Sequence, residues 1–243
     1  SSCIGLSEEM RLVRLLLERG YAVLALNSSD RSSGCWGGSI DLVNVRQVLG
    51  EFQKMLASNK EFTNKVENPV IAIGASSGGR FAAVLAAEKI ALGGSLVMVS
   101  ALGEPLRDRI IALKRELKRH PPLYLAPMPR DSGTTTRARN DFDAMIQHSS
   151  EGIFFDDKTC VPLPVTAEYL HERVPHLSKE RANMIIAALI NAGHLEAKLP
   201  TGKHIFVKDP TRSNWREIVK QQCEAKGCLL DQDLTPGMSP LAK

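Results

Sequence analysis

The sequence has little excess charge of either sign and no long apolar run. Its 243 residues include 31 basic and 27 acidic side chains, a net charge of +4, which is too small for a dedicated binder of nucleic acids or membrane surfaces. Arg14, Glu18 and Arg19 interrupt the best apolar stretch near the N-terminus, so no run approaches the roughly 18 apolar residues that a spanning helix needs. Because 43% of the residues are hydrophobic, we expect a soluble globular protein and not a disordered chain.

Cysteine is also scarce, and no signal peptide is evident. The five cysteines do not form the pattern of a disulfide framework and suit a reducing compartment, so we expect a cytoplasmic protein. Cys223 and Cys228 could pair, but no second cysteine pair or histidine stands at ligand spacing, and we predict neither a metal nor a cofactor. The chain begins at Ser1 without a basic and then apolar leader, and we expect that it could be a fragment of a longer protein.

Short apolar runs alternate with amphipathic stretches along the first 150 residues. The runs at 21–26, 69–74, 96–101 and 123–126 predict strands buried on both faces. Helical spacing of apolar residues predicts helices at 7–19, 41–56, 80–90, 105–118 and 134–147. This alternation indicates an α/β protein with a doubly wound, mainly parallel sheet and helices on both faces. Ligands of such sheets bind beyond the carboxyl ends of the strands.

The pattern changes after about residue 150. Helices are predicted at 166–173 and 178–192, and a hairpin or strand at 202–207. This order is typical of a winged helix, a module that docks on nucleic acids or proteins, or of a helical cap over the sheet. Residues 165–220 carry nine basic and six acidic side chains, too mild a balance for phosphate binding, so nucleic acid is not the expected partner. The predicted domains are a core at 1–150, this helical module at 151–220 and an irregular tail at 221–243.

One short motif carries chemistry. Gly74-Ala75-Ser76-Ser77-Gly78 matches the Gly-x-Ser-x-Gly nucleophile elbow, and it lies between an apolar strand run and an alanine-rich helix, which is the setting that the motif requires. In such a turn the serine backbone is strained, and small residues on either side let the strand and the helix approach. The N–H group of Ser77 would then be one oxyanion donor.

At these residues the chain resembles the α/β-hydrolase superfamily, from about Ser7 to Gln147. The resemblance implies a catalytic triad whose acid follows the strand at 123–126, where Asp131 stands, with a helix N-cap as the alternative role for this residue. A base should follow the acid, and His194, after Gly193 in a turn, is the best placed of five candidates; the others are His148, His171, His176 and His204. The family's second oxyanion donor would precede Ser7, beside strands that this chain does not contain.

Three functions remain open. The first is a serine hydrolase that cleaves a small-molecule ester or related acyl bond through an acyl-enzyme on Ser76. The second is a catalytically inactive scaffold that keeps the elbow for packing and binds a ligand or a protein partner. The third is nucleic-acid binding by the C-terminal module. Trp36 follows the strand run at 21–26 and could line the pocket or anchor its loop.

Overall fold

The computed structural model describes residues 7–59, 69–91, 93–116, 121–129, 131–148, 151–157, 164–174, 177–197, 204–206 and 213–224. The chain divides into two compact units, which are treated separately below. One comprises residues 24–161, and the other comprises residues 1–23 and 162–243. The domain boundaries predicted at residues 150 and 220 stay predictions.

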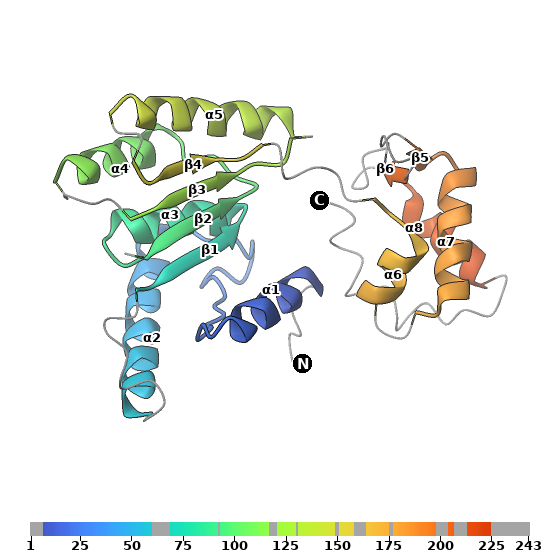
Figure 1. Ribbon diagram of the computed structural model, residues 1–243, viewed down its shortest axis with the longest axis horizontal. Coiled ribbons are helices and arrows are strands. Elements are labelled where there is room, and N and C mark those ends of the chain that lie inside the picture. Colours follow the sequence, from blue (N-terminus) through green and yellow to red (C-terminus); the bar gives the residue numbers. More distant parts are fainter. Residues whose placement is uncertain are drawn as a thin grey trace. The chain divides into compact units, whose positions relative to one another are not determined.

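The first unit, hereafter the sheet unit, contains four parallel strands in the order β1-β2-β3-β4 (Figure 1). The strands are β1 (Ile71–Ala75), β2 (Gly94–Met98), β3 (Leu123–Ala126) and β4 (Ile153–Phe155). Its helices are α2 (Gly38–Ser58), α3 (Ser77–Ala87), α4 (Glu104–Glu116) and α5 (Ser132–Ile146). The predicted α/β class with a parallel sheet is therefore confirmed, whereas a fold of the hydrolase type stays a prediction.

Helices α3, α4 and α5 pack on one face of this sheet. When parallel strands have the same order in the sequence and in the sheet, right-handed crossovers place all the connecting helices on one side of the sheet. In agreement, α4 contacts both α3 and α5. The core between them contains Ala83, Val97, Ile110, Leu125 and Met145, all fully buried. On the opposite face, Ile71, Tyr124 and Phe154 are 43%, 38% and 50% exposed.

The strand predicted at 21–26 is wrong. These residues form no β-ladder, and Tyr21 is 48% exposed. A strand exists only where a neighbour accepts and donates its backbone hydrogen bonds, and an apolar run in the sequence does not reveal whether that neighbour is present. The run instead leads into Ser28, which is buried at the start of a long loop before α2.

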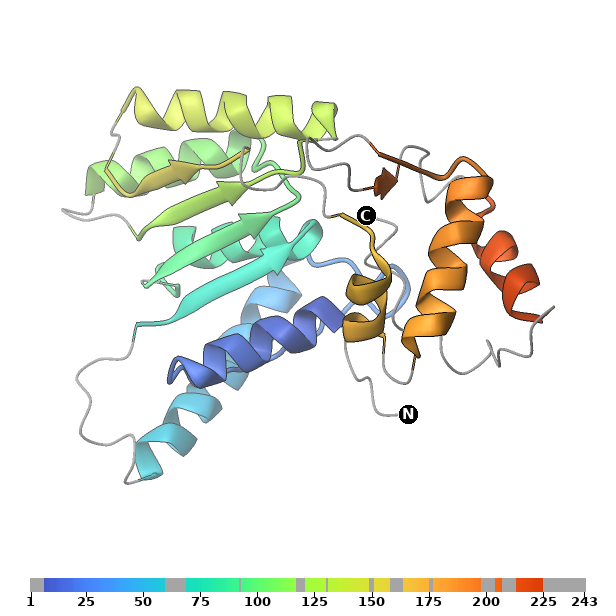
Figure 2. The ribbon, with the colours of Figure 1, turned by 45° about the vertical axis from the view of Figure 1, so that its right-hand side comes forward.

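The second unit has its own core. Its helices are α1 (Ser7–Glu18), α6 (Ala167–Arg173), α7 (Lys179–Asn191) and α8 (Trp215–Glu224), and the strands β5 (Leu195–Ala197) and β6 (His204–Phe206) form an antiparallel hairpin (Figure 2). Val165 donates its N–H to the carbonyl of His204 at 2.9 Å, which ties the segment before α6 to the hairpin. Leu170, Ile185, Leu189 and Trp215 are buried together in this unit. The predicted helix, turn, helix and hairpin are present.

The rest of the predicted tail, after Glu224, lies outside the described residues. Among the helices that the structure describes, none combines the length and the apolar character needed to cross a membrane.

Candidate active site

The turn after β1 has the conformation that the motif predicts. Ser76 has φ 55° and ψ −125°, a region that residues other than glycine rarely adopt. It is the N-cap of α3, and its side chain accepts no capping hydrogen bond from the helix. The Ser76 N–H donates to the Met98 carbonyl at 2.9 Å, and the Ser76 carbonyl accepts from the Arg80 N–H at 3.1 Å. The backbone is thus held on both sides while the side chain stays exposed at the sheet edge.

Two glycines let the backbone pack closely around Ser76. A Cβ on Gly74 would lie 2.2 Å from the carbonyl oxygen of Gly78, and a Cβ on Gly79 would lie 2.8 Å from the carbonyl oxygen of Met98. Neither position can accept a side chain unless the backbone moves. A Cβ on Gly78 would instead meet only the indole of Trp36, at 3.4 Å. The tight strand-to-helix turn therefore depends on Gly74 and Gly79, and Gly78 faces a side chain.

The main chain of Ser77 lies in the first turn of α3. Ser77 is the first residue of α3, and the N–H groups of a first helical turn have no acceptor within the helix and lie at its positive end. The Ser77 hydroxyl has a separate contact, because it accepts the main-chain N–H of Trp36 at 3.1 Å. A residue 41 positions earlier in the sequence is thereby fixed beside the elbow.

Two buried polar side chains hold the loop that carries Trp36. Asp41, which is 2% exposed, accepts the N–H of Gly37 and the N–H of Ser29, each at 2.8 Å. These donors keep the pKa of the Asp41 carboxyl below its usual value, with Gly37 contributing most. The buried Ser28 hydroxyl donates to the Cys35 carbonyl at 2.6 Å. The apolar pattern places Asp41 only at the start of the predicted helix at 41–56; the signal for its role is its position four residues after a glycine in a serine-rich loop.

Asp131 lies after β3, at the same edge of the sheet as Ser76. Since β1 and β3 are two strands apart, their carboxyl ends are separated by about 10 Å. Asp131 is the N-cap of α5 and accepts the Thr134 N–H at 3.0 Å. The N–H and hydroxyl of Thr134 keep the pKa of Asp131 below its usual value, so the carboxylate is ionised at neutral pH. The N-cap role that the sequence left open is present, and it is compatible with the role of triad acid.

The sheet unit offers no base near Ser76 among its described residues. His148 is the one histidine described there; it follows α5, which begins at the carboxyl edge after β3 and therefore ends at the amino edge of the sheet. At that end its Nδ1 lies 3.2 Å from a guanidinium nitrogen of Arg115. His148 is thus on the wrong edge of the sheet to activate Ser76.

The remaining histidine candidates belong to the second unit. His194 is 1% exposed, and its main-chain N–H donates to the Leu189 carbonyl at 2.8 Å in the turn after α7, where Gly193 has φ 65°. His171 has Nδ1 2.5 Å from the Leu177 carbonyl oxygen, His204 lies in β6, and His176 lies outside the described residues. The structure therefore brings Ser76, Ser77 and Asp131 to one sheet edge and leaves the proposed base, His194, in the other unit.

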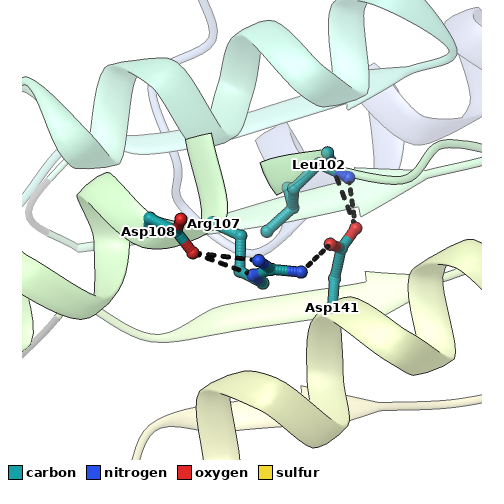
Figure 3. A network of polar contacts seen from close by, with 5 residues as sticks. Leu102, Arg107, Asp108 and Asp141 are labelled. Carbon is teal, nitrogen blue, oxygen red and sulfur yellow. Dashed lines mark hydrogen bonds and ion pairs between the residues drawn. The ribbon is translucent and has the colours of Figure 1, made fainter. Parts of the chain in front are cut away.

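Sequence reasoning missed a buried carboxylate that holds the loop after β2. Asp141, which is 4% exposed in α5, accepts the N–H of Leu102 at 2.8 Å and the N–H of Gly103 at 3.2 Å, and Arg107 approaches it to 3.8 Å (Figure 3). It anchors the loop between β2 and α4 to α5. The signal was an aspartate on the buried stripe of a helix, three residues after Ala138 and four before Met145.

A surface groove of about 320 Å³ lies elsewhere in the sheet unit, between the C-terminal end of α3 and α4. Ion pairs line it: Glu88 pairs with Arg46 and Arg109, and Lys89 pairs with Glu116. Because α3 begins at the carboxyl edge with Ser77, its end lies at the amino edge of the sheet. The groove is therefore remote from the elbow.

Comparisons with protein-family models, curated proteins and solved structures found no match to this chain.

Proposed function

We propose that this protein is a serine hydrolase of the α/β-hydrolase type, which cleaves an ester or related acyl bond through an acyl-enzyme on Ser76. The observation that carries the proposal is the strained backbone of Ser76, with φ 55° in a tight strand-to-helix turn. Such strain costs about 1–3 kcal/mol and persists only where the surroundings enforce it, and it concentrates at functional sites. A turn kept only for packing would gain stability from glycine at this position.

The reaction follows from the groups at the sheet edge. The Ser76 hydroxyl attacks the acyl carbon and gives its proton to a base, and the carbonyl oxygen becomes an oxyanion facing the Ser77 N–H. Collapse breaks the bond to the leaving alcohol, which takes the proton from the base. Water then attacks the acyl-enzyme by the same steps and releases the acid. A donor such as Ser77 N–H is worth about 2.7–4 kcal/mol in the transition state.

The base stays the sequence prediction His194, and Asp131 is the proposed acid. Asp131 supports this role because it is ionised and exposed at the sheet edge where Ser76 stands. A triad member is worth about 10⁴-fold in kcat, so His194→Ala should lower the rate of labelling by a serine-directed fluorophosphonate by a large factor. Asn caps helices as well as Asp does, so Asp131→Asn separates the two roles of this residue: it should slow labelling without lowering stability.

A specific observation favours the alternative of an inactive scaffold. Among the described residues of the sheet unit, the one histidine lies at the amino edge of the sheet, away from Ser76. In this case the elbow would bind a ligand without activating the serine.

Labelling with the fluorophosphonate distinguishes the two functions. Wild type and a matched surface variant, Ser58→Ala, should be labelled equally, and Ser76→Ala should not be labelled. Folded wild type that remains unlabelled between pH 6 and pH 9 would establish the scaffold. If His194→Ala is labelled as fast as wild type while Ser76→Ala is not, Ser76 is the nucleophile and the base is another residue.

A further inference from the structure

Trp36 borders the elbow and is fixed there by a hydrogen bond and a ring contact. Its main-chain N–H donates to the Ser77 hydroxyl at 3.1 Å. Its ring stacks on Phe81, with centroids 4.8 Å apart and an interplanar angle of 24°. Its Cδ1 and Nε1 atoms lie 3.4 and 3.6 Å from the position of a Cβ on Gly78. Phe81 is 6% exposed, so the indole rests on a buried ring in the core.

These contacts place the indole at the end of α3 where Ser76 lies. The Cα–Cβ direction of a helical residue points toward the helix N-terminus, so an atom in contact with the Cβ position of Gly78 lies over the first turn of α3. Gly78 is two residues after Ser76. Trp36 is only partly buried, so part of its surface contacts solvent.

Trp36 does more than anchor its loop. The loop is already closed by Asp41, which accepts the N–H groups of Ser29 and Gly37, and by the Ser28 hydroxyl on the Cys35 carbonyl. A small side chain at position 36 could make the same main-chain bond to Ser77. The indole stacks on Phe81, and the part of it that stays exposed beside the proposed nucleophile offers a flat apolar surface to the group that the nucleophile would bind.

We propose that Trp36 selects the acyl group at Ser76 and that the preferred substrates are esters of planar aromatic acids. The proposal rests on the hydrolase function proposed above. Ser77 is the positioning residue, because its hydroxyl fixes the main chain of Trp36 while its N–H faces the oxyanion. Aromatic pairs favour stacked or edge-to-face contacts, and their strength corresponds to a two- to tenfold preference over contact by an aliphatic group of equal area.

Two esters with the same leaving group test the selection. The ratio of kcat/KM for p-nitrophenyl benzoate to that for p-nitrophenyl acetate isolates the acyl group, because a general loss of activity does not change it. Trp36→Ala should lower this ratio about two- to tenfold, and Trp36→Phe, which keeps a ring, should retain most of it. Ser77→Ala should also lower the ratio, and Ser77→Thr, which keeps the hydroxyl, should restore it. An unchanged ratio in an active Trp36→Ala protein would overturn the proposal.

A binding measurement keeps the inference separate from catalysis. The difference in emission between wild type and Trp36→Phe isolates the fluorescence of Trp36. Methyl benzoate should change this emission at concentrations where methyl acetate does not, in wild type and in Ser76→Ala alike. If neither p-nitrophenyl ester is hydrolysed but methyl benzoate changes the emission, the hydrolase function is wrong and the aromatic binding site is supported. If the p-nitrophenyl esters are hydrolysed and methyl benzoate does not change the emission, the aromatic binding site is wrong and the hydrolase function is supported.

Discussion

The turns after β1 and β2 lie side by side and share a positive φ, yet only the first leads directly into a helix. Ser76 has φ 55° and Val99 has φ 54°. Each N–H donates to the neighbouring strand, Ser76 to the Met98 carbonyl at 2.9 Å and Val99 to the Ala126 carbonyl at 3.0 Å. After Ser76 a helix begins at once, whereas after Val99 a loop runs to α4 at Glu104. The proposed site therefore differs from the second turn in its adjoining helix N-terminus and exposed hydroxyl, not in its φ value.

The two turns are also held by different means. Backbone atoms packed against glycines hold the elbow, with Gly74 against Gly78 and Gly79 against Met98. A buried carboxylate holds the loop after Val99, because Asp141 accepts the N–H groups of Leu102 and Gly103. Substitutions that add a side chain at the glycines of the elbow should therefore destabilise the protein. In the loop after Val99, removal of the Asp141 carboxylate should do so.

Gly74→Ala should have the largest effect. The new Cβ would lie 2.2 Å from the Gly78 carbonyl oxygen, and because both partners are backbone, the free energy of unfolding should fall by about 3 kcal/mol or more. Urea denaturation measures this loss. The matched control is Gly50→Ala in α2, where a Cβ meets nothing within 4 Å and alanine should stabilise the helix by about 0.5–1 kcal/mol. Equal stabilities for the two variants would contradict the close packing of the elbow.

Asp141→Ala should have the next largest effect on the free energy of unfolding. It leaves the N–H of Leu102 without its buried acceptor and costs about 2 kcal/mol, whereas the exposed Asp143→Ala in the same helix should change the stability by less than about 0.5 kcal/mol. Hydrogen exchange sharpens the comparison, because the amides of Leu102 and Gly103 should lose protection while the amide of Ser76 should not. Loss of protection at Ser76 would show that the two turns are coupled.

Much of the sheet could be predicted from local runs of apolar residues, whereas the hydrogen bonds that hold the loops around the candidate site could not. The apolar run at 123–126 and the motif at Ser76 specify a strand and a turn by themselves, and β3 and the elbow are where the sequence puts them. The run at 21–26 is also entirely apolar but forms no strand. Strand pairing and the hydrogen bonds of Asp141 to Leu102 and Gly103 join residues that are distant in the sequence, so a local periodic pattern does not reveal them.

Asp41→Asn tests the loop that carries Trp36, with an effect that depends on pH. The N–H groups of Gly37 and Ser29 lower the pKa of Asp41 in the folded state, so its stabilisation is complete above the unfolded pKa of about 3.9 and is lost as the pH falls through the folded value. Asparagine accepts with one oxygen only, which should cost about 1–2 kcal/mol at pH 7.

The difference in unfolding free energy between wild type and Asp41→Asn should shrink from pH 7 toward pH 3, as measured by urea denaturation at each pH. A difference that stays constant over this range would mean that the Asp41 carboxylate does not gain from its two donors.

The smallest effects come from placing glycine at the two strained residues. A left-handed backbone costs a non-glycine residue about 1–2 kcal/mol, and glycine avoids this cost. Glycine also increases the conformational entropy of the unfolded chain, which offsets part of the gain in stability. Ser76→Gly should therefore stabilise the protein by about 0.5–1 kcal/mol while abolishing labelling by the fluorophosphonate. Val99→Gly should stabilise it less, because the half-buried valine side chain is lost, and labelling should persist. If Ser76→Gly were instead the less stable protein, the serine would be retained for its contacts, and the strain at the elbow would not be a cost of function.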